Sequence, residues 1–285
     1  MDQDTLNHSL LLAAKENDWP LAKKLIEQGA DILFANPGGW TAAHYFANHS
    51  NDWALENLMV ANPAVLEQQL KTSGCTPANK LANCNNNRFV FFAKQYPCIL
   101  RHRSYGTTPT LRFAYSGNVD VVIALAKIDP SVLQQRAGTL GTAAHLFAFK
   151  RDAWALSQLA AHYPEVLQQR AKGKCRYPLH ILIRQGRHAF LDIKQLLEDH
   201  PKALYYEDTD HTNALMLLGN RPYHMLLSMI IKPEHVRHRN SNGDTILSYV
   251  RREITMYDAI RIARLVRPHL SWKELYQLSK RVPPT

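Results

Sequence analysis

The sequence predicts an all-α solenoid of stacked helix-turn-helix units joined by fingertip loops, which lead from one unit into the next. Two observations predict it: a Thr-led motif recurs along the chain, and a Pro-x-x-Leu motif follows most copies at a similar offset. The motif starts are 32 to 35 residues apart, a period typical of helical repeats that bury their apolar faces only against neighbouring units. They lie at Thr41, Thr76, Thr108, Thr142, Tyr177, Thr212 and Thr245.

Each start predicts a short first helix followed by a longer second one. Threonine accepts a backbone N–H bond as an N-cap, and proline directly after it is tolerated because the first turn does not need its N–H. Small residues fill 42–47, where helices of adjacent units must approach closely. In the same unit, Leu55, Leu58 and Met59 share one face of a predicted amphipathic helix over 53–60.

The Pro-x-x-Leu motif predicts how each unit ends. Proline stops the second helix, and we expect the apolar residues behind it to plug the gap between units. The motif occurs at Pro63–Leu66, Pro97–Leu100, Pro130–Leu133, Pro164–Leu167 and Pro201–Leu204. Trp19, Trp53 and Trp154 each lie 12 residues into their unit, so we expect them to be packing residues of the second helix. Trp19 also places a first, degenerate unit at about 7–39.

The residue types within the repeat resemble the ankyrin family. Tyr177-Pro-Leu-His180 is close to the Thr-Pro-Leu-His start of ankyrin repeats, and Gln28-Gly-Ala-Asp31 resembles the usual end of their second helix. The tetratricopeptide pattern, which has the same period, is absent. The resemblance covers about residues 5–270 in roughly eight units. It implies an ankyrin-repeat solenoid at 1–270, followed by a capping helix and tail at 271–285, where Ser271 and Glu274 form a predicted capping box.

The style of these repeats narrows the resemblance. Eroded units that end in Pro-Glu-Val-Leu-Gln-Gln resemble those of ankyrin proteins that intracellular bacteria deliver into host cells as effectors. The resemblance implies a cytoplasmic protein, in the host cytoplasm if it is such an effector. The four cysteines agree with a reducing compartment, because they form no dense disulfide framework. No run reaches the roughly 20 apolar residues that span a bilayer.

No catalytic, metal or cofactor site is predicted. His44, His145 and His180 occupy one repeat position, where the family uses histidine to bridge neighbouring loops by hydrogen bonds. They are at least one unit apart, about 10 Å for packed helices, which prevents a shared metal. The chain holds no Cys-x-x-Cys pair and no glycine-rich phosphate loop. Two Asp/Asn-rich segments, 208–210 and 240–244, superficially match calcium loops, but we interpret them as fingertip turns. Cys75 and Cys84 are expected at exposed positions, and Cys98 is expected to be packed.

The net charge of +10 is uneven along the chain. It is −2 over residues 1–100, +5 over 101–210 and +7 over 211–285. A positive half can steer an acidic partner or a nucleic acid toward the protein. We therefore expect a monomer that binds another protein with an acidic or mixed surface. Two alternatives stay open: a binder of nucleic acid or acidic lipid through the basic C-terminal half, and an enzyme hidden in the divergent last units.

The repeat phase names the positions that face the expected concave groove. They are the fingertip residues around each start and the two residues that end each first helix. Large aromatic side chains and cations at those positions are our candidates for partner binding. They are Trp40, His49, Tyr105, Tyr115, Phe149, Lys150, Lys174, Arg176 and Arg184. For Trp40 and Phe149, an alternative is that they cover gaps left by irregular units.

Overall fold

The computed structural model describes residues 2–84, 87–172, 176–185, 190–219, 227, 230–253, 260, 263–264, 267–278 and 280. Within these residues all regular secondary structure is helical, and no strand is found. Two isolated bridges, Ser104 with Thr107 and Glu207 with Asn213, close individual loops. The predicted all-α class is therefore confirmed for the described part of the chain.

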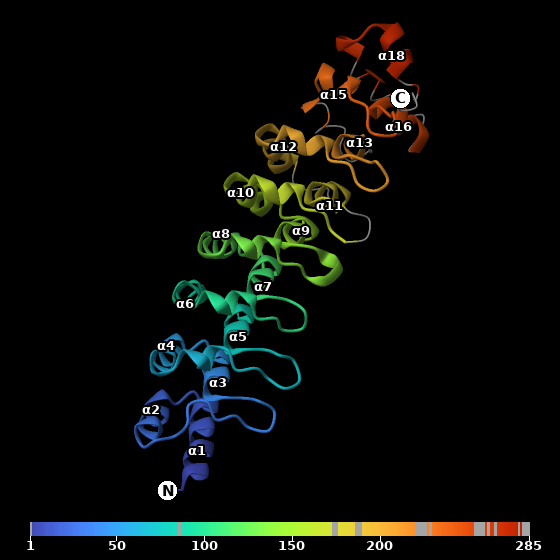
Figure 1. The fold of residues 1–285 in the computed structure, drawn as a ribbon. Coiled ribbons are helices and arrows are strands. Elements are labelled where there is room, and N and C mark those ends of the chain that lie inside the picture. The colour runs from blue at the N-terminus through green and yellow to red at the C-terminus, as the bar shows by residue number, and fades with distance from the viewer. Residues whose placement is uncertain are drawn as a thin grey trace. The chain divides into compact units, whose positions relative to one another are not determined.

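The chain divides into two compact parts, which we call the N-terminal half (Met1–Gly138) and the C-terminal half (Thr139–Thr285). Over residues 42–205, a first helix is followed by a second helix, a 3-10 turn and a loop, and this series repeats (Figure 1). The order of elements therefore follows the sequence repeat within both halves of the chain.

The described residues of the N-terminal half form four helix pairs. The first helix of each pair packs on the first helix of the next pair. α1 packs on α3, α3 on α5 and α5 on α7, and in the second layer α6 packs on α8. The helices are α1 (Gln3–Lys15), α2 (Trp19–Glu27), α3 (Ala42–Asn48), α4 (Asp52–Ala61), α5 (Pro77–Asn83), α6 (Phe89–Gln95), α7 (Pro109–Tyr115) and α8 (Val119–Ile128). The 3-10 turns are η1 (Pro63–Leu66), η2 (Pro97–Arg101), η3 (Pro130–Gln134) and η4 (Gly138–Leu140).

The described helices of the C-terminal half make the same kind of contacts. α9 packs on α11, α11 on α13 and α13 on α16, while α10 packs on α12. The helices are α9 (Ala143–Phe149), α10 (Ala153–His162), α11 (Pro178–Gln185), α12 (Phe190–Asp199), α13 (Ala214–Leu218), α15 (Pro233–Arg237), α16 (Ile246–Glu253) and α18 (Trp272–Leu278). The 3-10 turns are η5 (Pro164–Gln168), η6 (Pro201–Tyr205) and η8 (Arg267–His269).

The Pro-x-x-Leu motifs form the 3-10 turns η1, η2, η3, η5 and η6, each with proline in its first turn. The third and fourth residues of each motif are buried, for example Val65 and Leu66 in η1. The predicted plug between units is thus confirmed, since these side chains fill the space beneath the second helices.

The predicted caps are confirmed in part: the side chain of Thr108 makes no cap hydrogen bond to α7 and turns to Gln135, and one further start is displaced by a residue. Thr41 and Thr76 form capping boxes with the third residue of their helices, and Ser271 forms one with Glu274. Thr212 was the wrong start, because Asn213 caps α13 by accepting the Met216 N–H at 3.0 Å. Asparagine is as good an N-cap as threonine, so the helix begins one residue later than the phase predicts.

The prediction that all three tryptophans pack inside is wrong for two of them. Trp19 is 5% exposed, whereas Trp53 is 60% and Trp154 52% exposed. The Trp19 ring meets Phe46 and Trp53 edge-on, at centroid distances of 5.7 and 5.5 Å. The next unit offers Trp53 no aromatic cover, since Arg88 stands at the equivalent position and turns to Glu56 and Phe91.

Two cysteine predictions are also wrong. Cys75 is buried, and its backbone carbonyl accepts a hydrogen bond from the unit before it. Cys98 is exposed, because it follows the proline of η2 on the solvent side while Ile99 and Leu100 point inward. Its thiol donates to the Glu67 carboxylate at 3.1 Å, and partial desolvation of the sulfur together with the Glu67 contact raises the pKa of the Cys98 thiol. Cys84 is exposed as predicted.

Candidate partner-binding surface

The repeated histidine serves the fold. In the N-terminal half, His44 Nδ1 accepts the Thr41 N–H at 3.2 Å. Nε2 therefore carries the proton and donates to the Cys75 carbonyl at 3.0 Å. In the C-terminal half, His145 makes the same two contacts, with the Thr142 N–H and the Arg176 carbonyl. Each imidazole therefore joins its helix start to the next fingertip loop, which confirms the predicted bridging role.

The predicted bridge is not found at His180, because neither nitrogen of its buried ring has a hydrogen-bond partner among the described residues. Tyr177 replaces the capping threonine, and its ring lies edge-on to His180 at 5.4 Å. Burial lowers the pKa of His180 to about 4, and the same cause lowers the pKa of His44 to about 4. Both rings are therefore neutral at pH 7, a state suited to a packed structural group.

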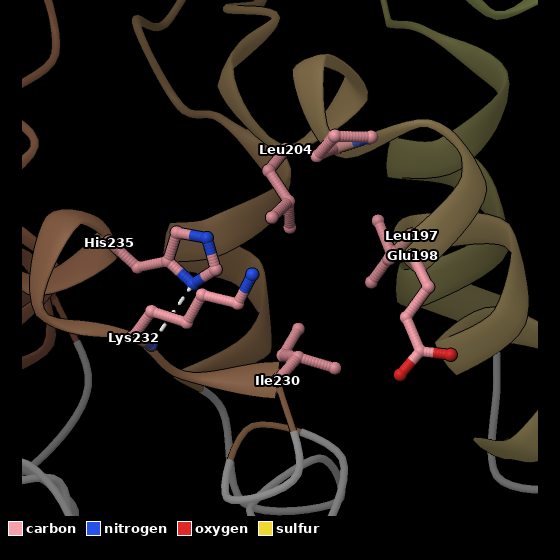
Figure 2. A pocket seen from close by; sticks show the side chains of 7 residues that line it. Leu197, Glu198, Leu204, Ile230, Lys232 and His235 are labelled. Carbon is pink, nitrogen blue, oxygen red and sulfur yellow. Dashed lines mark hydrogen bonds between the residues drawn. The ribbon is translucent and has the colours of Figure 1, made fainter.

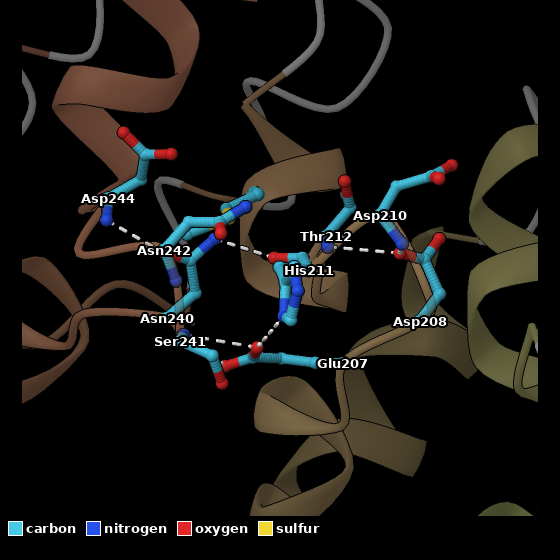
Figure 3. A network of polar contacts seen from close by, with 10 residues as sticks. Glu207, Asp208, Asp210, His211, Thr212, Asn240, Ser241, Asn242 and Asp244 are labelled. Atoms are coloured by element: carbon cyan, nitrogen blue, oxygen red, sulfur yellow. Dashed lines mark hydrogen bonds and ion pairs between the residues drawn. The ribbon is translucent and has the colours of Figure 1, made fainter. Parts of the chain in front are cut away.

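In each of the two segments that superficially match calcium loops, one side chain turns an oxygen onto its own backbone (Figure 3). Asp208 Oδ1 accepts the N–H groups of Asp210 and Thr212, both at 3.0 Å. Asn240 Oδ1 accepts those of Asn242 and Asp244. These contacts are Asx turns, so the predicted fingertip interpretation explains both segments.

The same two loops hold each other. The Glu207 carboxylate accepts the Ser241 N–H at 3.0 Å and lies 3.4 Å from His211 Nδ1. Asn240 Nδ2 donates to the His211 carbonyl at 2.6 Å (Figure 3). Adjacent fingertips are thus fixed by hydrogen bonds, and they present a preformed edge to solvent.

Tyr105 and Tyr115 are the most exposed of the predicted aromatic residues. Tyr105 is 75% and Tyr115 55% exposed, one in the loop before α7 and the other at its last residue. Tyr105 has a φ of 50°, in the left-handed region, and the turn around it is closed by paired hydrogen bonds between Ser104 and Thr107. The Tyr105 ring is therefore held outward on a short, closed loop.

Trp40 and His49 are less available than the sequence predicts. The Trp40 ring is half-buried, stacks on Tyr45 at 4.9 Å and has the Lys80 ammonium 4.6 Å from its centroid. Its contacts favour the alternative that Trp40 covers a gap. His49 is exposed, but its Nε2 lies 3.0 Å from the Lys15 carbonyl oxygen and holds neighbouring helix ends together.

In the C-terminal half, the predicted site residues differ in exposure and in the residues they contact. Phe149 is 37% exposed at the end of α9, and Lys150 follows it as the exposed C-cap. Arg176 is half-buried. Arg184 Nη2 lies 3.7 Å from Asp208 Oδ2, and the Asp208 side chain is 0% exposed. Lys174 lies outside the described residues.

Sequence reasoning missed the groups that hold these residues. Lys80 and Asp208 each come from a later unit than the residue they contact, Trp40 and Arg184 respectively. An acidic residue 24 positions after a cation, as Asp208 lies after Arg184, does not match the repeat period and is too weak a pattern to single out.

The described residues contain no group of three or more His, Cys, Asp or Glu side chains arranged to hold a metal ion. Within that same part of the chain, no helix combines the length and apolar character needed to cross a membrane. No protein-family model matches the chain, and no curated protein matches its sequence.

Proposed function

We propose that the chain is an ankyrin-type repeat protein that holds another protein on its fingertip loops and first-helix ends. The repeat phase, the threonine caps and the bridging histidines support this architecture, because each links one unit to the next. Repeat proteins of this type bind through side chains that are displayed by a fixed backbone. Binding without catalysis is the function that such a display favours.

The observation that carries the proposal is the outward position of Tyr105. A tyrosine that is 75% exposed on a hydrogen-bonded turn places a large apolar ring in water on a fixed backbone, and its two side-chain torsions cost little entropy to order on binding. Tyrosine is also enriched among the residues that dominate binding energy at interfaces. Tyr115, at the other end of α7, provides a second ring for the same surface.

The charge of the chain supports a partner with an acidic or mixed surface. The net charge of +10 raises the encounter rate with such a partner and lowers it with a basic one. The partner's contact with Tyr105 and Tyr115 would be apolar, and its acidic groups would lie nearby. We propose that the protein acts as a monomer on one partner at a time.

A photo-cross-linking amino acid at position 105 or 115 tests this proposal. Position 53 is the control, because Trp53 is just as exposed but lies on a second helix. We expect one protein to cross-link at 105 and 115 and not at 53. Tyr105→Ala with Tyr115→Ala should then weaken its binding by at least about tenfold. Unchanged affinity in the double variant would exclude this surface.

A second candidate function rests on the basic C-terminal part, which carries +7 over residues 211–285. A nucleic acid or an acidic lipid surface would bind there through charge alone. Such binding weakens steeply with salt, so the affinity for duplex DNA or for anionic vesicles should fall with a constant log–log slope. No retention on heparin at low salt would remove this candidate.

The effector proposal concerns location. The Pro-Glu-Val-Leu-Gln-Gln style of the repeats supports a bacterial protein delivered into the host cytoplasm. A fusion to an enzyme that reports only from the host cytoplasm tests it. Signal from infected cells is expected, and its loss in bacteria without a secretion system provides the control.

A further inference from the structure

A pocket lies in the C-terminal half of the chain, where the end of α12 and the turn η6 face α15 (Figure 2). Its volume is ≈ 280 Å³. The lining combines an apolar wall with one acid, one amine and one imidazole at the side. The lining residues are Leu197, Glu198, Pro201, Leu204, Ile230, Lys232 and His235.

The sequence explains why a pocket opens at this place. The third residue of the Pro-x-x-Leu turns is a buried branched aliphatic in η1, η2, η3 and η5. In η6 it is Ala203, and in the corresponding segment of α15 it is His235. His235 is itself part of the pocket lining, so a polar ring stands there in place of the branched aliphatic side chain of the other turns.

The imidazole of His235 is a fixed part of the wall. His235 is buried, and its Nδ1 accepts the Lys232 N–H at 3.2 Å (Figure 2). The proton of the neutral ring is therefore on Nε2. Burial lowers the pKa of His235, so the ring adds no charge to the pocket at pH 7.

The charges at the pocket do not cancel. The Glu198 carboxylate is paired with Lys194 Nζ at 3.1 Å on the same helix. Lys232 is exposed, its chain runs beside the His235 ring, and no ion pair of Lys232 is found among the residues that the structure describes (Figure 2). The pocket thus has an apolar interior, a carboxylate that is already paired with Lys194, and the cation Lys232 at its edge.

We propose that this pocket binds an aliphatic carboxylate, with the alkyl group against Leu197, Leu204 and Ile230 and the carboxylate on Lys232. A single ammonium balances one negative charge, which favours a carboxylate over a phosphate. At roughly 30 Å³ per water-sized group, the pocket admits about ten non-hydrogen atoms. A free fatty acid of about eight carbons has this size, and so does a polypeptide's last residue when it is Leu or Ile.

The site is independent of the tyrosine surface proposed above. All pocket residues belong to the C-terminal half, whereas Tyr105 and Tyr115 belong to the N-terminal half. A carboxylate against an ammonium at the edge of an apolar wall is a charge-assisted contact, stronger than one between neutral groups. A ligand of ten atoms with ordinary efficiency per atom gives a Kd of about 1 mM.

Titration of the full chain with octanoate, followed by NMR or calorimetry, tests the proposal. 1-Octanol is the control ligand, because it has the same chain without the charge. Lys232→Met keeps the apolar stem and removes the cation, while Lys202→Met removes an exposed lysine of η6 that does not line the pocket. A pentapeptide ending in leucine, free or amidated at its C-terminus, separates the two sources of the carboxylate.

We expect octanoate to bind at least about tenfold more tightly than octanol, and Lys232→Met to remove this preference while Lys202→Met keeps it. Tighter binding of the free peptide than of octanoate would assign the site to a chain end, and the reverse to a fatty acid. Equal affinity for octanoate and octanol, or no binding of either carboxylate, would overturn the proposal. Thermal melting of each variant shows that it is folded.

Discussion

The Nε2 atom of His44 lies 3.0 Å from the carbonyl oxygen of Cys75, 31 residues further along the chain. On its other side, Nδ1 accepts the N–H of Thr41, which caps the same helix. The imidazole is fully buried, and this burial lowers its pKa to about 4. One side chain therefore couples a helix start to the loop of the following unit, and it does so only in its neutral form.

This coupling predicts a pH dependence. The pKa of His44 is about 4 in the folded chain and 6.5 as the unperturbed value, so between these pH values the unfolded state binds the proton more tightly. The free energy of unfolding should therefore be unaffected by this group above pH 6.5. It should fall as pH drops toward 4, by up to about 1.4 kcal/mol per pH unit. Urea denaturation at pH 7, 6 and 5 measures this.

His44→Gln should remove that part of the slope, because glutamine has no proton to gain in this range. His49→Gln is the matched control, since His49 belongs to the same unit but is exposed. A wild-type slope in His44→Gln would mean that His44 is not the group responsible.

The glycines before the helix starts predict a second contrast. Gly39 has a φ of +88°, and a Cβ there would lie 2.9 Å from the Gln69 carbonyl oxygen and 3.0 Å from the Lys71 nitrogen. Gly106 has a φ of +75° with no atom within 4 Å of the same point. Gly106→Ala should cost about 1 kcal/mol, for the left-handed conformation alone. Gly39→Ala should cost at least about 1 kcal/mol more, because the backbone of the next unit must move. Equal midpoints in urea would refute the close approach at Gly39.

The two tryptophans at one repeat position predict opposite outcomes of one substitution. Trp19 is buried against Phe46, so Trp19→Ala should cost about 3–5 kcal/mol. Trp53 is 60% exposed, so Trp53→Ala should cost about 1 kcal/mol or less. Chemical denaturation of the two variants compares them directly. Similar losses would show that Trp53 packs as the sequence pattern alone predicts.

Local features of this fold could be predicted from the sequence, and contacts between units could not. A threonine cap or a proline break acts within one turn, so the phase of Thr41 and Pro63 placed helix ends to within a residue. Burial of Trp53 depends on what the next unit presents, and Arg88 there is a residue that the repeat pattern does not fix. The pocket beside Lys232 depends likewise on a plug residue that departs from the pattern, His235.

The last prediction concerns Arg184, which is both a candidate partner-binding residue and a counterion. Asp208 is fully buried, its Oδ1 is used by two backbone N–H groups, and its Oδ2 faces Arg184 Nη2 at 3.7 Å. Arg184→Met removes the cation and leaves a buried carboxylate without it. Because the arginine is 34% exposed and the contact is long, the cost should be about 1–2 kcal/mol rather than that of a fully buried pair.

Asp208→Asn supplies the test of this cause. Asparagine keeps the Oδ1 acceptor and the turn but carries no charge, so in its background Arg184→Met should cost much less. A double-mutant cycle by urea denaturation measures the difference, and the same cost in both backgrounds would show that the pair contributes no coupling. If the coupling is found, a loss of partner binding in Arg184→Met alone mixes recognition with loop stability. The asparagine background separates the two, since there the arginine is free to act on the partner only.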